Sequence, residues 1–230
     1  MSRPPADWIA TLPRTRLLAE YSMWSADLIR LADDLVRISP YADILHVDVA
    51  DGHFAPALLF FPDLVARLRD RTALPIHVHL MVADAVLLSQ IDQFAEVGAD
   101  LISLHVENAN AAAGLDRIAM HGLGAGMVLR VETPVAEAAR WLPRLEMLTL
   151  LGTAIGVKGQ GLNVAATDRL AAAARLIADT GRQIVLAADG GIRDTTVPLL
   201  RAAGAQTVVM GSLAFGAPDL ASRMRWLHGL

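Results

Sequence analysis

The sequence of 230 residues contains no cysteine. A disulfide framework and a thiolate metal site are therefore excluded, and any metal ion must be held by histidine and carboxylate side chains. The chain also lacks an uninterrupted apolar run of about 18 residues, the length that predicts a membrane-spanning helix. Basic residues form no stripe, because 20 Lys and Arg are interspersed with 24 Asp and Glu, for a net charge of −4. We therefore expect neither a membrane nor a nucleic acid as a partner.

Apolar residues are abundant, at 54% of the chain, whereas charged residues make up 19%. This composition is sufficient for a large buried core, and we expect a soluble protein. Residues 1–16 carry prolines and charges and lack the apolar core of a secretory signal, so we interpret them as the short leader of a cytoplasmic protein. Residues 17–230 have a length at which α/β barrels form one domain, about 200–250 residues.

Short apolar segments alternate with longer amphipathic segments along the chain, as expected for βα units around a parallel sheet. Eight apolar segments are predicted as buried strands: Leu17–Tyr21, Ile44–Val49, Pro75–Met81, Leu101–His105, Gly124–Leu129, Met147–Leu151, Ile184–Ala188 and Thr207–Met210. Eight helices are predicted at Asp27–Ile38, Pro62–Asp70, Val86–Val97, Ala111–Met120, Pro134–Trp141, Ala166–Thr180, Thr195–Ala203 and Pro218–Trp226. The sequence thus predicts a single (β/α)8 TIM barrel, and a doubly wound open sheet is the main alternative.

Histidine and aspartate side chains occur near the ends of three predicted strands. Residues two apart in a strand share a face, and the carboxyl ends of barrel strands form the catalytic end. We therefore expect two imidazoles and two carboxylates to converge on one cation: His46, Asp48, His79 and Asp189. Taken separately, each aspartate could instead cap a helix. His77 lies deeper in its strand and is interpreted as a hydrogen-bonded core residue.

Glycines follow the last three predicted strands and indicate a phosphate site. Gly190-Gly191 and Gly211-Ser212 come after the seventh and eighth strands, where many barrels present backbone N–H groups to a phosphate. Gly159-Gln160 follows the sixth strand and would complete such a site, with Lys158 as an additional cation. A small phosphorylated molecule is the expected ligand.

Five segments resemble the signature segments of the ribulose-phosphate 3-epimerase family, in the same order: Ser22–Asp27, His46–Phe54, Val78–Met81, Ala188–Ile192 and Gly211–Gly216. They span about residues 17–216. The resemblance implies a TIM barrel of the ribulose-phosphate-binding type and an isomerase that inverts C3 of a ketose phosphate, with D-ribulose 5-phosphate and D-xylulose 5-phosphate as the first pair to test.

The resemblance also implies roles for particular residues. The four predicted ligands match the family's divalent-metal ligands, and Asp48 and Asp189 match its acid–base pair. Ser22 matches the hydroxyl near the reacting carbons, and Met81 remains from an apolar cap. Inversion needs two proton carriers on opposite faces of the substrate, which two separate strands can supply. Two imidazoles and two carboxylates suit Zn, Fe(II), Mn or Co.

Several positions depart from the family pattern. The loop after the sixth strand reads Ile155–Gln160 instead of Pro-Gly-Phe-Gly-Gly-Gln, and Ala50 and Leu151 stand where methionines are usual. Ala57 replaces a polar amide, and Phe61 adds bulk. These changes leave open a different ketose phosphate, such as a hexulose 6-phosphate or a tetrulose phosphate.

Other functions are kept as alternatives. A lyase of the related barrels would need an Asp-x-Lys-x-x-Asp string, whereas Asp48–Asp51 contains no lysine. A non-catalytic phosphosugar-binding barrel would hold no metal and exchange no C3 hydrogen. The apolar outer helix expected at Ala166–Ile177 leaves a homo-oligomer open.

Overall fold

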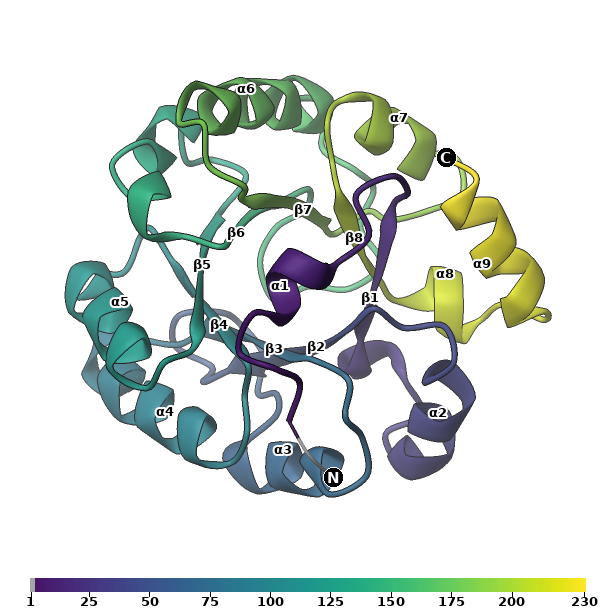
Figure 1. The fold of residues 1–230 in the computed structure, drawn as a ribbon, viewed down its shortest axis with the longest axis horizontal. Coiled ribbons are helices and arrows are strands. Elements are labelled where there is room, and N and C mark those ends of the chain that lie inside the picture. The colour runs from purple at the N-terminus through teal and green to yellow at the C-terminus, as the bar shows by residue number, and fades with distance from the viewer. Residues whose placement is uncertain (1–2) are drawn as a thin grey trace.

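Eight parallel strands form a closed barrel in the computed structural model, which describes residues 3–230 (Figure 1). The strands are β1 (Leu18–Ser22), β2 (Ile44–Ala50), β3 (Ile76–Met81), β4 (Leu101–His105), β5 (Gly124–Leu129), β6 (Met147–Leu151), β7 (Val185–Asp189) and β8 (Thr207–Met210). They follow chain order, and β8 pairs with β1 in parallel. The predicted (β/α)8 barrel is confirmed, and the open sheet is excluded.

Helices form an outer ring around the strands (Figure 1). The ring contains α2 (Leu31–Ile38), α3 (Pro62–Arg69), α4 (Asp84–Glu96), α5 (Ala111–Met120), α6 (Ala166–Asp179), α7 (Val197–Ala202), α8 (Ser212–Phe215) and α9 (Leu220–His228). Helix α4 is typical, because Leu87, Ile91 and Phe94 recur at helical spacing and are all buried. Among residues 3–230, no helix combines the length and the apolar character needed to cross a membrane.

Two predicted helices differ by more than two residues from those in the structure. The helix expected at 134–141 is replaced by two 3₁₀ turns, η2 (Val135–Ala138) and η3 (Leu142–Arg144). Pro143 lies in the second turn, two residues beyond the expected helix, so it does not account for the missing α-helix. The helix expected from Asp27 begins at Leu31, because the Asp27 carboxylate accepts a hydrogen bond from Ile29 N at 3.1 Å and forms a local turn instead.

The N-terminal segment covers one end of the barrel. A short helix, α1 (Trp8–Thr11), lies across the barrel axis in Figure 1. Trp8 is 5% exposed and packs on inward-facing side chains at the amino ends of the strands: Leu18, Ile44, Leu101, Met147 and Val185. This end of the barrel is therefore apolar and closed, which leaves the carboxyl ends of the strands for the site.

The middle of the barrel is polar. The next inward-facing positions carry polar side chains that are all fully buried: Glu20, His46, His77, Ser103, Thr149 and Thr207. Polar groups at this depth destabilise a barrel unless they are hydrogen-bonded. Their contacts therefore bear directly on the site above them.

Candidate active site

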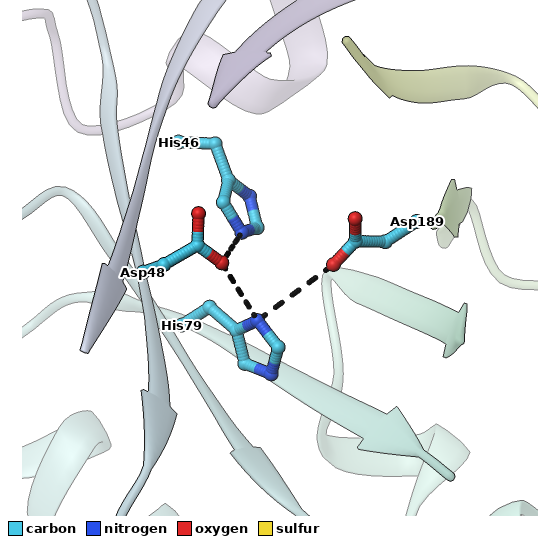
Figure 2. A group of neighbouring side chains, drawn as sticks. All are labelled: His46, Asp48, His79 and Asp189. Atoms are coloured by element: carbon cyan, nitrogen blue, oxygen red, sulfur yellow. Dashed lines mark hydrogen bonds and ion pairs between the residues drawn. The ribbon is translucent and has the colours of Figure 1, made fainter. Parts of the chain in front are cut away.

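Four predicted side chains meet at the carboxyl ends of three strands. His46 and Asp48 belong to β2, His79 to β3 and Asp189 to β7, and Figure 2 shows Asp189 facing the other three. Each offers one ligand atom, and these atoms all lie within 4.8 Å of one another. The structure therefore brings together the cluster that the sequence predicts, although the role of each residue remains a prediction.

Short distances connect the four side chains. Asp48 Oδ1 lies 3.1 Å from His46 Nε2 and 3.6 Å from His79 Nδ1, and Asp189 Oδ2 lies 3.8 Å from the same His79 atom (Figure 2). Both histidines and Asp48 are buried, whereas the Asp189 side chain is 18% exposed. Asp189 is therefore the member most open to a ligand in the mouth.

Hydrogen bonding fixes which nitrogen of His79 carries a proton. Burial opposes ionisation of Glu107, but hydrogen bonds from His105 and Thr133 outweigh it and lower the Glu107 pKa to about 2. Burial lowers the pKa of His105 to about 4, so His105 is neutral and donates Nδ1–H to Glu107 at 3.1 Å. His105 Nε2 must then accept, at 2.9 Å, from Nε2–H of His79. The lone pair of His79 Nδ1 is thereby directed at the two aspartates.

His46 is fixed from its other side. Its Nδ1 lies 2.8 Å from Glu20 Oε1, and burial of Glu20 is outweighed by two neighbouring imidazoles, which lower the Glu20 pKa to about 2. An ionised Glu20 can only accept a hydrogen bond. His46 Nδ1 therefore donates to Glu20. Burial lowers the pKa of His46, but Asp48 and Glu20 outweigh it and raise that pKa well above its usual value, so without a metal ion Nε2 holds a proton shared with Asp48.

The cluster has the donor set of a cation site. Four acceptor groups converge, and His79 Nδ1 makes no hydrogen bond with any of the described residues. Acceptors facing one another at these distances repel unless a proton or a metal ion lies between them. Two imidazoles and two carboxylates suit a divalent transition metal, so the residues present fit the ion that the sequence implies.

The two aspartates differ electrostatically. Burial raises the pKa of Asp48, but His46 and His79 outweigh it and hold that pKa below its usual range. Burial and the charge on Asp48 raise the pKa of Asp189 to about 6. A pair of carboxylates with separated pKa values is typical of acid–base sites.

A cavity of about 360 Å³ opens above the cluster. All the predicted substrate-binding residues line it: Ser22, Met81, Gly159, Gln160, Gly190, Gly191, Gly211 and Ser212. Asp48, His79 and Asp189 line the same space. Ser22 Oγ donates to Asp48 Oδ2 at 2.7 Å, so it holds one carboxylate in position.

The glycine pair after β7 has a conformational reason. Gly190 and Gly191 adopt φ values of +88° and +69°, a region that other residues rarely enter. A Cβ atom on Gly190 would lie 2.3 Å from Thr153 Oγ1, and one on Gly191 would lie 2.8 Å from Leu162 Cα. The pair therefore allows the loop between β6 and α6 to pack directly against the end of β7.

Three further residues at the mouth were missed or left undecided by the sequence. Trp24 and Arg193 also line the cavity; Trp24 lies within the signature segment Ser22–Asp27 but was given no role, and no pattern marked Arg193. Arg193 Nη2 donates to Gln160 O at 3.1 Å, and Lys158 Nζ donates to Trp24 O at 2.6 Å. The loop between β6 and α6 is thus tied to the chain after β7 on one side and after β1 on the other.

His77 is confirmed as a hydrogen-bonded core residue. It is fully buried, its Nδ1 bonds to Glu20 Oε1, and its Nε2 lies 2.7 Å from Ser103 Oγ. Glu20 itself was missed by the sequence analysis. A single acid within an apolar strand was the available signal, because a buried charge is costly without partners.

The site has the features of an enzyme active site in a TIM barrel: paired carboxylates, imidazoles and glycine-rich loops at the carboxyl ends of the strands. The family model described as "Ribulose-phosphate 3 epimerase family" matches residues 18–215. Ribulose-phosphate 3-epimerase 2 of Cupriavidus necator is 36% identical over 207 residues, which cover 86% of this chain and 84% of that protein. Ribulose-phosphate 3-epimerase of Serratia marcescens is 34% identical over 210 residues, covering 89% and 98%.

The chain therefore belongs to the ribulose-phosphate 3-epimerase family, and the predicted assignment to the carbohydrate isomerases is confirmed. The crystal structure of 3-keto-L-gulonate-6-phosphate decarboxylase from Vibrio cholerae aligns with a TM-score of 0.69 at 15% identity, covering 92% of this chain and 99% of that one. At this identity the likeness supports the fold alone.

Proposed function

We propose that the protein is a metal-dependent epimerase that inverts C3 of a ketose phosphate and interconverts D-ribulose 5-phosphate and D-xylulose 5-phosphate. The observation that carries this proposal is the placement of Asp48 and Asp189 on different sides of one cavity, around a cluster suited to a cation. The names of the two relatives support the choice of substrate.

The two aspartates would divide the proton transfers. One carboxylate removes the C3 proton from its face of the substrate, and the C–H electrons move toward the C2 carbonyl to form an enediolate. The other aspartate, in its protonated form, returns a proton to C3 from the opposite face, so the configuration inverts. The reverse reaction exchanges the two roles. Ser22 orients Asp48, and Met81, 2% exposed, contributes an apolar wall.

The cluster would hold one divalent cation through His46, Asp48, His79 and Asp189, with Zn, Fe(II), Mn and Co all compatible with these donors. When bound, the cation would supply stabilisation of the negative charge that develops on the substrate oxygens. The protein contributes the imidazole orientation, which Glu107 sets for His79 through His105.

The phosphate group of the substrate would lie against the glycine-containing loops after β7 and β8. Gly190-Gly191 and Gly211-Ser212 line the cavity, as do residues of the loop between β6 and α6. Lys158, the single lysine of the chain, lies on that loop. Its ammonium group bonds a carbonyl and lies 4.5 Å from the Trp24 ring centroid, so both partners are neutral. Its charge is therefore available to a phosphate dianion.

Replacing this lysine should weaken substrate binding selectively. We expect Lys158→Met to raise KM about tenfold with little change in kcat, because a charge-assisted hydrogen bond contributes about 1.5 kcal/mol and acts equally in the ground and transition states. Lys158→Arg should recover most of the loss. Steady-state kinetics would measure both variants, and an unchanged KM in Lys158→Met would remove Lys158 from the phosphate site.

The unusual residues divide between the cavity and its surroundings. Leu151 and the loop residues Ile155, Val157 and Lys158 line the cavity, whereas Ala50 and Ala57 pack in the cluster that contains Met81. Phe61, expected near the mouth, is 58% exposed at the start of α3 and is not among the lining residues. The departures that reach the cavity are therefore concentrated at the end of β6 and in the loop that follows it.

A panel of four-, five- and six-carbon ketose phosphates would test the substrate. We expect turnover of D-ribulose 5-phosphate, with each added or missing carbon lowering kcat/KM by about tenfold or more. A higher kcat/KM on a hexulose 6-phosphate or tetrulose phosphate would identify that compound as the preferred substrate, and the proposed C3 epimerisation would still stand. Binding without C3 hydrogen exchange would favour the non-catalytic barrel instead.

A further inference from the structure

The polar layer beneath the cluster contains a carboxylate that the proposed reaction does not use. Glu20 lies on β1, is fully buried, and its Oε1 atom accepts hydrogen bonds from Nδ1 of His46 and Nδ1 of His77. Its Oε2 atom accepts none from residues 3–230. Burying a carboxylate with an unmatched oxygen is destabilising relative to a well-packed apolar residue, which favours a functional reason for its presence.

The hydrogen bonds around Glu20 run in one direction. Ser103 Oγ lies 2.7 Å from His77 Nε2, and Nδ1 of the same ring bonds to Glu20. A carboxylate accepts only, so His77 donates through Nδ1 and accepts the Ser103 hydroxyl proton at Nε2. This fixed bond holds Oε1 in place, 2.8 Å from His46 Nδ1.

The consequence for His46 is a defined tautomer. With Nδ1–H committed to Glu20, Nε2 is the nitrogen that projects into the cluster, 3.1 Å from Asp48 Oδ1, and it is the one that would exchange its proton for a metal ion. The other tautomer would place an N–H in the cluster and would leave His46 Nδ1 and Glu20 Oε1 as two acceptors facing each other. Carboxylates that hold a ligating histidine through its second nitrogen strengthen metal binding about 10–100-fold.

We propose that Glu20 is a positioning residue, which selects the metal-binding tautomer of His46 and is itself held by His77 and Ser103. The inference rests on the proposed metal site and adds to it a determinant that touches neither substrate nor metal. A merely structural Glu20 would affect stability and leave the metal affinity of the folded protein unchanged.

Titration of the metal-free protein with Co²⁺ tests this directly, because the visible absorption of Co²⁺ reports its coordination. We expect Glu20→Ala to raise the Co²⁺ dissociation constant about 10–100-fold and to change the spectrum. Glu20→Gln should fall between Glu20→Ala and the native protein, since an amide oxygen is a weaker acceptor and the amide N–H₂ stabilises the wrong tautomer. Thr207→Val is the control, because Thr207 lies in the same buried layer and its hydroxyl donates to Leu18 O rather than to a histidine, and it should bind Co²⁺ as the native protein does.

The outcomes separate the two proposals. If the native protein binds no Co²⁺, the metal site fails, and the role of Glu20 fails with it. If the native protein binds Co²⁺ and a folded Glu20→Gln binds it with the affinity of Thr207→Val, the metal site stands and the role of Glu20 is overturned. Glu20→Gln nearly matches glutamate in shape, so it decides the question even if Glu20→Ala does not fold.

Discussion

Asp48→Asn and Asp189→Asn should each lower the rate of epimerisation by about 10²–10⁴-fold, because each removes the proton carrier for one face of C3. The two variants should differ in one respect. A protein with one remaining base can still remove and return a proton on the same face, so each variant should exchange the C3 hydrogen of only one epimer with solvent. The two variants should favour opposite epimers, which NMR in D₂O would show.

Asp168→Asn is the matched control, since Asp168 is an exposed carboxylate in the first turn of α6 that is not among the residues lining the cavity. Metal content must be measured in parallel, because both active-site aspartates are also predicted ligands. Near-native turnover by either variant with its metal bound would contradict the two-base mechanism, and a single carboxylate would then have to serve both faces.

Metal removal should have the other large effect. We expect dialysis against a chelator to lower kcat about a thousandfold, because a cation contributes several kcal/mol to stabilising the developing charge. Adding back a divalent ion should restore activity. His79→Ala should behave like the metal-free protein, since the Nδ1 atom of His79 faces both carboxylates.

His121→Ala is the control for this experiment, because His121 is an exposed histidine that pairs with Asp92 at 2.8 Å. It should retain both metal and activity. Full turnover by a protein whose measured content of divalent metal is far below one ion per chain would contradict the proposed metal dependence.

The barrel strands were predictable to within one residue at each end. Strands covered on both faces read as short, nearly unbroken apolar runs, and β2 is buried at all seven of its positions. The cluster was predictable for a related reason. Once a residue is placed at the carboxyl end of a barrel strand, the fold itself brings it to the common mouth.

Contacts between distant residues were not predictable in the same way. His46 and His77 lie 26 and 57 positions from Glu20, and Lys158 lies 134 positions from Trp24. Such pairs depend on strand register and on the course taken by a loop, neither of which a local pattern contains. The segment after Pro134 forms two 3₁₀ turns instead of the expected helix, and no residue in it explains the difference.

The most direct test of the account is incubation of the metal-loaded protein with D-ribulose 5-phosphate in D₂O, followed by NMR. We expect D-xylulose 5-phosphate to form with deuterium at C3, and the remaining ribulose 5-phosphate to gain deuterium there as well. The absence of both a new epimer and C3 exchange, in a protein with its metal site filled, would contradict the account.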